Sequence, residues 1–241
     1  MLRCVVALLL VILTAGWTAE TRADEPLLTP FNAMYTVKRE GMVIGENQRT
    51  LTAGKDGRYV YESIARATGW VAWLFRDEVL ERSVWVYANS RIRPLEYTYG
   101  RSRGRNQRRV QLAFDWDRKL VTNNVDSDAW RMPLPDDAQD KLVYQLSIMR
   151  DMQRPHPDLV YHIADGGMIK TYKFAITGQE NLPTPMGTMH TVKIERVGDK
   201  RDTSVWLAPS LQYLPVKISQ TDKDGSELSM HLSSVTGIVP R

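Results

Sequence analysis

The sequence predicts a mainly β protein in which an antiparallel curved sheet forms a barrel or half-barrel with one principal α-helix. Apolar and polar residues alternate in most segments, turn-forming Gly, Asn, Asp and Pro residues separate these segments, and helical spacing is clear only once. With 241 residues, 43% of them hydrophobic and 25% charged, the composition is that of an ordinary globular protein. No linker or repeat divides the sequence, so we expect a single β-rich domain over residues 24–241.

Residues 1–23 have the pattern of a secretory signal peptide. Arg3 supplies the charged start, residues 5–13 form a short apolar run, and small and polar residues precede a cleavage site after Ala23. A retained membrane anchor is the alternative, but the run is shorter than the roughly 20 residues that a bilayer requires. Cys4 lies within this segment. We therefore expect an exported mature chain that contains no cysteine and no disulfide.

Period-two alternation begins in residues 31–40, where Phe31, Ala33, Tyr35 and Val37 share one side of a predicted strand. Similar runs predict strands over residues 47–53, 58–67, 78–88, 92–99, 108–116, 119–125, 159–164, 169–178, 189–197, 203–207, 214–221 and 227–234. A sheet with this many strands is expected to curl or fold over, because long flat sheets leave unpaired edges exposed.

One segment, residues 137–153, has the spacing of a helix. Asp137 and Asp140 fall in its predicted first turn, where carboxylates interact favourably with free N–H groups and the helix dipole. Pro155 lies just beyond its predicted end. The expected apolar face consists of Leu142, Leu146, Met149 and Met152. We expect this face to pack on the sheet.

Motifs for catalysis or metal binding are weak. Residues 100–104 spell G-x-S-x-G, but no helix is predicted after them, as a nucleophile elbow requires. The four histidines lack the spacing of metal ligands, and residues 222–225 contain only the beginning of a calcium loop.

The net charge of +4 is too small to indicate nucleic-acid binding. We expect no enzyme activity, metal, cofactor or nucleic-acid partner, and an enzyme acting on an envelope polymer is the least favoured reading.

An arginine-rich stretch overlaps the G-x-S-x-G string. Five guanidinium groups fall within nine residues, a density suited to phosphates of lipids or to acidic polysaccharides. Among them, Arg101, Arg103 and Arg105 are the candidate anion contacts. The competing interpretation is a solvated hairpin whose charges prevent edge-to-edge association.

The most unusual segment is residues 69–75, Gly-Trp-Val-Ala-Trp-Leu-Phe, which is apolar without alternation. It is expected either to fill the core or to form a lid that contacts an acyl chain, a membrane surface or a partner. The candidate ligand-binding residues are Trp70, Val71, Trp73, Leu74 and Phe75.

Several motifs along the chain carry a resemblance to a known family. They are Tyr35-x-Val37 with Gly41 and Gly45, Pro135-Asp136-Asp137-Ala138-x-Asp140, Ala164-Asp165-Gly166-Gly167-x-Ile169-Lys170-x-Tyr172, Thr184-Pro185-x-Gly187, and Trp206-Leu207-Ala208-Pro209-x-Leu211-x-Tyr213-Leu214-Pro215-Val216. With the signal peptide, they resemble the exported bacterial family catalogued as domain of unknown function 3108. The resemblance implies a periplasmic or envelope protein of Gram-negative bacteria without an assigned activity. It supplies no catalytic residues.

Residues 205–225, a strand, a Pro-containing turn, a second strand and Asp-Lys-Asp-Gly, are also similar to periplasmic lipoprotein carriers. In those carriers a curved antiparallel sheet covered by helices holds acyl chains, whereas one clear helix is predicted here. This resemblance is one of fold alone. The predicted function is a non-enzymatic envelope protein that binds an apolar ligand, such as a lipid or acyl chain, on the concave side of the sheet.

The alternative function is a protein-interaction or structural module of envelope assembly without a ligand cavity. The expected partners are accordingly a lipid or an envelope protein, and a peripheral contact with a membrane is compatible with either function. The sequence does not determine the oligomeric state.

Overall fold

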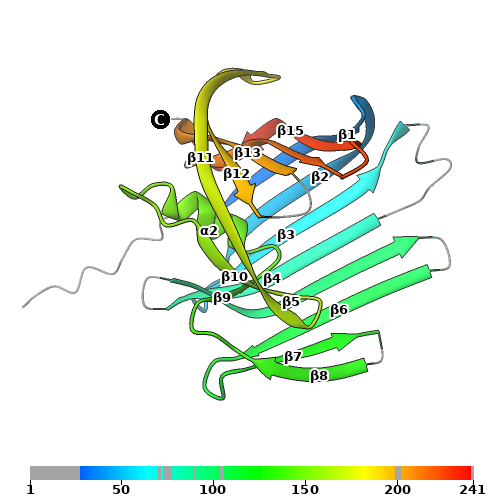
Figure 1. Cartoon of the computed structure of the whole chain (residues 1–241), viewed down its shortest axis with the longest axis vertical. Helices are drawn as coiled ribbons and strands as arrows, with labels where there is room; N and C mark the ends of the chain where they lie inside the picture. Colours follow the sequence, from blue (N-terminus) through cyan, green and yellow to red (C-terminus); the bar gives the residue numbers. More distant parts are fainter. Residues whose placement is uncertain are drawn as a thin grey trace, which may run out of the picture.

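The computed structural model describes residues 28–69, 72, 78–88, 91–103, 106–126, 128–198 and 202–239. In this part of the chain, fifteen strands form one open sheet, with β8 at one edge and β9 at the other. Helix α2 (Tyr144–Asp151) and the short 3-10 helix η1 (Pro209–Leu211) complete the fold (Figure 1). The predicted class, a curved antiparallel sheet with one principal helix, is confirmed.

The first eight strands are β1 (Phe31–Arg39), β2 (Met42–Ala53), β3 (Arg58–Ala67), β4 (Glu78–Ala88), β5 (Arg91–Arg103), β6 (Asn106–Asp115), β7 (Leu120–Val125) and β8 (Asp128–Pro133). The other seven are β9 (Ala138–Asp140), β10 (Val160–Asp165), β11 (Met168–Thr184), β12 (Gly187–Val197), β13 (Asp202–Ala208), β14 (Leu214–Thr221) and β15 (Glu227–Thr236).

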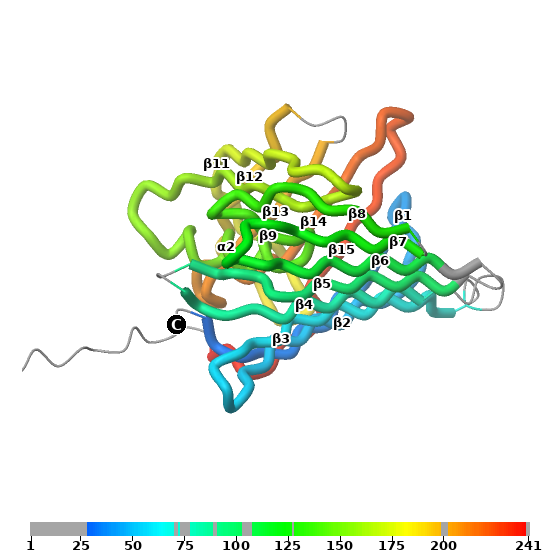
Figure 2. Tube along the Cα trace, turned by 90° about the horizontal axis from the view of Figure 1, so that it is seen from below, coloured from blue at the N-terminus to red at the C-terminus, as the bar shows by residue number. Residues whose placement is uncertain are grey.

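The strands are joined mainly as a meander of hairpins. From β1 to β8 each strand pairs antiparallel with the next, and β10 to β15 pair in the same way (Figure 2). The two halves are joined where β1 pairs with β15, with Asn32 opposite Thr236. Among the strands of the described residues, β9 and β10 are the one parallel pair. Tight turns make this order possible, as at Gly41, whose φ of 76° suits glycine.

The sheet curls so far that its two ends approach each other. Ser83 on β4 donates a hydrogen bond to Asp140 on β9, although these strands lie far apart in the sheet order. At the turn between β10 and β11, a Cβ atom on Gly167 would lie 2.6 Å from the ring of Trp130 on edge strand β8. These two contacts place β9 and the β10–β11 turn against the inner face of the first half of the sheet.

Helix α2 lies on the concave side and is almost entirely enclosed (Figure 1). Leu146 and Met149 join a core cluster with Leu51 and Trp85 of the first half. Ile148 instead joins a second cluster with the strands β10 to β13. The helix therefore fills the middle of the curved sheet, and any cavity must lie beside it.

The structure corrects three expectations. The helix begins at Tyr144 instead of residue 137, because residues 138–140 pair with β10 as a strand. Its predicted apolar face is nonetheless buried, with Leu142 in the preceding turn and Met152 at the helix end. Strand β8 was not expected, and β11 extends to Thr184 instead of residue 178. No helix in the described ranges has the length and apolar character needed to cross a bilayer.

Candidate functional site

Strand β2 carries a charged side chain on the face that it turns toward α2. Asn47, Arg49 and Leu51 share this face, because every second residue of a strand points to the same side. All three are buried, and Arg49 is only 6% exposed. Its Nη1 donates a 2.6 Å hydrogen bond to the Oε1 atom of Gln145 on α2. The buried guanidinium thus connects the sheet to the helix.

The hydrogen-bond partners of Arg49 in the described ranges are all neutral. Its Nε donates to the Oδ1 atom of Asn47 at 3.1 Å, and its Nη2 lies 3.8 Å from the sulfur of Met230. Its Cζ lies 5.2 Å from the ring centre of Tyr35, and Tyr61 is a further hydrogen-bond partner. No carboxylate of a described residue forms an ion pair with it. The guanidinium is therefore solvated by neutral groups.

The surroundings of Arg49 keep it charged. Burial alone lowers the pKa of a guanidinium, but nearby groups raise the pKa of Arg49 above its ordinary value, and the carboxylate of Glu81 is the one among them that acts through a negative charge without a hydrogen bond to Arg49. Burial conversely raises the pKa values of Tyr35 and Tyr61, which stay neutral. A buried positive charge without a paired anion is costly, and structural sites usually provide one.

A pocket of about 180 Å³ lies beside this guanidinium, between α2 and the strands β11 and β13 to β15. We call it the Arg49 pocket. Among its lining residues Arg49 is buried, whereas Leu228 is 43% exposed, so the Leu228 side of the pocket is the more accessible to solvent. Its walls are largely apolar and include Ile148, Phe174, Val205, Leu207, Ile218 and Leu228.

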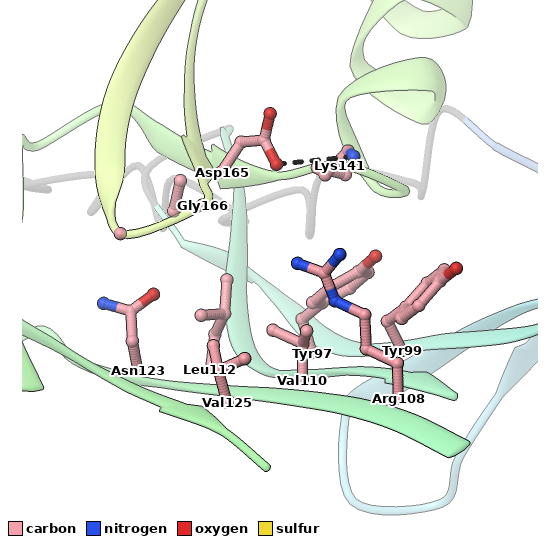
Figure 3. A pocket seen from close by; sticks show the side chains of 12 residues that line it. Tyr97, Tyr99, Arg108, Val110, Leu112, Asn123, Val125, Lys141, Asp165 and Gly166 are labelled. Carbon is pink, nitrogen blue, oxygen red and sulfur yellow. Dashed lines mark ion pairs between the residues drawn. The ribbon is translucent and has the colours of Figure 1, made fainter. Parts of the chain in front are cut away.

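A second pocket of about 180 Å³ lies between the strands β5 to β7 and the β10–β11 turn. We call it the Asn123 pocket. Figure 3 shows Arg108 and Asn123 projecting from the sheet toward Lys141, Asp165 and Gly166 on the opposite side. Lys141 forms an ion pair with Asp165, with 3.3 Å between Nζ and Oδ1. This pocket differs from the first because charged and amide groups face it from both sides.

Of the predicted anion contacts, Arg101 is outside the lining of both pockets. Arg101 is opposite Arg108 in the β5–β6 hairpin and lines a shallow hollow with Arg109. Arg103 is paired through its backbone with Asn106 at the hairpin end. Arg105 lies outside the described residues. The hairpin interpretation of this stretch is confirmed, while its anion binding stays a prediction.

The predicted ligand-binding residues Trp70, Val71, Trp73, Leu74 and Phe75 also lie outside the described residues, so their role stays a prediction. Ser102 of the G-x-S-x-G string is opposite Gln107 within the β5–β6 hairpin, which is not the strand-to-helix turn of a nucleophile elbow. Within the described ranges, no group of three or more His, Cys, Asp or Glu side chains could hold a metal ion.

Sequence reasoning missed both Arg49 and Asn123. The signal for Arg49 was present, because it shares the period-two face of β2 with Leu51, which is an apolar residue. Asn123 likewise lies two residues from Val121 and from Val125 on β7. A polar residue in register with apolar neighbours indicates a buried polar group, and buried polar groups need partners.

The comparison with solved structures shows that another β protein has a similar architecture. The crystal structure of a beta-barrel-like protein with the domain DUF1849 from Brucella abortus has a TM-score of 0.56, with 8% identity over 89% of this chain and 99% of the other. At this identity the likeness concerns the fold alone.

Two further crystal structures are less similar. A proposed lipoprotein from Parabacteroides distasonis has a TM-score of 0.36 and 9% identity, over 88% of this chain and 97% of the other. A proposed outer membrane lipoprotein-sorting protein domain from Vibrio parahaemolyticus has a TM-score of 0.25 and 10% identity, over 88% and 86% of the two chains. Likenesses at this level carry no argument about the present chain.

No curated protein matches the sequence. One family model does, over residues 32–233, and its description is "Protein of unknown function (DUF3108)". The match covers most of the chain and includes both pockets.

Proposed function

This chain belongs to the DUF3108 family of proteins of unknown function, and we propose that it is a binding protein of the cell envelope that holds one acyl chain with an acidic head group. The acyl chain occupies the Arg49 pocket and the head group pairs with Arg49. The role is one of binding and not catalysis. The observation that carries the proposal is a buried guanidinium, with only neutral hydrogen-bond partners, on the lining of a largely apolar pocket.

The apolar walls provide the attraction for the chain. Removing apolar surface from water stabilises a complex by about 25 cal/mol per Å², and Phe174, Val205 and Ile218 offer such surface along the pocket. At about 180 Å³ the pocket is smaller than the roughly 300–1,000 Å³ that holds drug-sized ligands. We therefore expect one short chain, and not a lipid with several chains, to fit inside.

The guanidinium provides the preference for an acid. A carboxylate can accept two parallel N–H bonds from arginine, and such charge-assisted bonds are about twice as strong as neutral ones. At Arg49 a ligand carboxylate would supply a hydrogen-bonded anion, whereas Glu81 acts on Arg49 only through space. We expect the head group to lie deepest, because Arg49 is buried and Leu228 is exposed.

The proposal is tested by isothermal titration calorimetry of dodecanoate, below its micelle concentration, into the mature protein. Two matched variants place the same new charge on exposed apolar positions. Leu228→Glu introduces a carboxylate at the pocket opening, and Val197→Glu introduces one on β12 away from the pocket lining. We expect saturable binding to the wild type, at least tenfold weaker binding to Leu228→Glu and unchanged binding to Val197→Glu.

Equal binding by both variants would place the chain elsewhere on the protein. If the wild type binds no dodecanoate under conditions in which a known carrier does, the acyl-chain function fails. An interaction module without a ligand cavity then takes its place. Melting temperatures of both variants check that they are folded.

A further inference from the structure

We infer that the Asn123 pocket is a second binding site, separate from the Arg49 pocket, and that it takes a phosphate or carboxylate group. The inference does not depend on the proposed acyl-chain function, because the two pockets share no lining residue. It rests on an unpartnered buried amide, an excess of positive charge, and a small pocket volume.

The amide of Asn123 is the first observation. Asn123 is 1% exposed, and its Nδ2 atom has no hydrogen-bond partner among the described residues. Buried amide groups are nearly always hydrogen-bonded, so a donor left unpaired at the wall of a pocket indicates a missing acceptor. Figure 3 shows this side chain projecting into the pocket toward the Asp165–Gly166 turn. A ligand oxygen is the simplest acceptor.

The charges around the pocket favour an anion. Arg108 projects from β6, and Lys141 faces it from the turn before α2 (Figure 3). Asp165 is the one acid on the lining, and it is already neutralised by Lys141 at 3.3 Å and by Lys170 at 2.7 Å. Three cations thus surround one carboxylate. A phosphate or carboxylate group in the pocket could accept a hydrogen bond from Asn123 and would be attracted by the charges of Arg108 and Lys141 on the same lining.

The shape of the pocket restricts the size of the ligand. Val110, Leu112 and Val125 form an apolar floor around the polar groups. Trp130 packs against Gly167 so closely that no Cβ atom fits between them, which fixes the turn above the pocket. The volume of about 180 Å³ admits a small molecule or a head group and excludes a polymer chain. The anion could belong either to a free small molecule or to a lipid head group.

The test follows the side-chain amide signal of Asn123 by NMR in the ¹⁵N-labelled mature protein, assigned by its loss in Asn123→Ser. Inorganic phosphate is added at constant ionic strength, and a parallel titration with sodium chloride is the comparison. In a second arm, vesicles of phosphatidylcholine with phosphatidic acid are compared with vesicles of phosphatidylcholine alone. Arg108→Gln and Lys141→Gln remove cations from the pocket. Arg109→Gln is the matched control, because Arg109 does not line this pocket.

We expect a saturable shift of the Asn123 signal that weakens at least fivefold in Arg108→Gln and Lys141→Gln and not in Arg109→Gln. A response to inorganic phosphate assigns the site to free anions, whereas a response only to phosphatidic acid assigns it to a lipid head group. Either result supports the inference. It is overturned if neither probe shifts the signal, if chloride shifts it equally, or if all three arginine and lysine variants behave alike. Loss of dodecanoate binding would leave it unaffected.

Discussion

The Ser83 hydroxyl donates a 2.6 Å hydrogen bond to the Oδ2 atom of Asp140, which joins strand β4 to strand β9 across the inside of the sheet. The Oδ1 atom of the same carboxylate accepts the backbone N–H groups of Leu142 and Val143, at 2.8 and 2.7 Å. Asp140 is fully buried. One carboxylate therefore holds the start of the α2 segment in its place against the sheet.

This carboxylate makes stability depend on pH. Burial raises the pKa of Asp140 from 3.8 to about 6, against the opposing effect of its three hydrogen bonds. Between these values the folded protein binds more protons than the unfolded chain, so the contribution of Asp140 to stability falls as the pH rises from about 4 to 6. At about 1.4 kcal/mol per pKa unit, the loss is about 2–3 kcal/mol.

Replacing Asp140 with Asn should remove this dependence. We expect the free energy of unfolding of Asp140→Asn, relative to wild type, to increase by about 2–3 kcal/mol between pH 4 and pH 7.5. Urea denaturation at the two pH values measures it. Asp117→Asn removes an exposed carboxylate and is the control. Its free energy of unfolding should change with pH as that of the wild type does. A constant difference for Asp140→Asn would show that folding does not raise the pKa of Asp140.

The packing of α2 predicts a large loss of stability on change of Leu146. Leu146 is fully buried between the helix and the sheet. Leu146→Ala should cost about 2–5 kcal/mol, and Leu146→Asp should prevent folding because it buries an unpaired charge. Circular dichroism melting curves check both. Lys223→Ala, in the exposed turn between β14 and β15, should change stability by no more than about 0.5 kcal/mol. An unchanged melting temperature for Leu146→Asp would refute this placement of the helix.

The contact between Trp130 and Gly167 predicts a specific rescue. Gly167 has a φ of 80° and no room for a Cβ atom, whereas neighbouring Gly166 has a φ of 61° and open space around it. Each substitution by Ala carries backbone strain of about 1–2 kcal/mol, but only Gly167→Ala also clashes with the Trp130 ring. Gly167→Ala should therefore be less stable than Gly166→Ala by urea denaturation.

The double variant separates the clash from the backbone strain. Combining Gly167→Ala with Trp130→Ala should recover part of the loss, because the ring that clashes is absent. Strictly additive losses in the double variant would mean that the edge strand β8 does not press on the β10–β11 turn.

Most strands could be predicted because half-buried strands alternate apolar and polar residues and turns contain residues with special backbone preferences. Strand β8 could not be predicted in this way, because Met132 is its only buried residue and its sequence shows little alternation of buried and exposed positions. Residues 137–143 resembled a helix start, with acids before an apolar face. Their actual conformation depends on Ser83 and on strand β10, which are distant in sequence and invisible to a local pattern.

The sequence analysis placed an apolar ligand on the concave side of the sheet, and ligand binding there stays a prediction. Both candidate pockets lie on that side. The residues predicted from the sequence are not the ones on which the two proposed sites depend. The sequence signals were strongest in conspicuous clusters, namely residues 69–75 and the arginines from Arg101 onward. Arg49 and Asn123 are single polar residues in ordinary strands. Their importance arises from burial and from the partners around them, which only the tertiary structure defines.

Whether Arg49 binds the acidic head group of an acyl ligand is measured by comparing the affinities for dodecanoate and dodecanol in wild type and Arg49→Gln. Since charged hydrogen bonds contribute about 1.5–3 kcal/mol, we expect the wild type to bind dodecanoate about 10- to 100-fold more tightly than dodecanol. Arg49→Gln should lose that preference while its dodecanol affinity changes little. Equal affinities of the wild type for acid and alcohol, or an unchanged preference in folded Arg49→Gln, would show that Arg49 does not bind the head group.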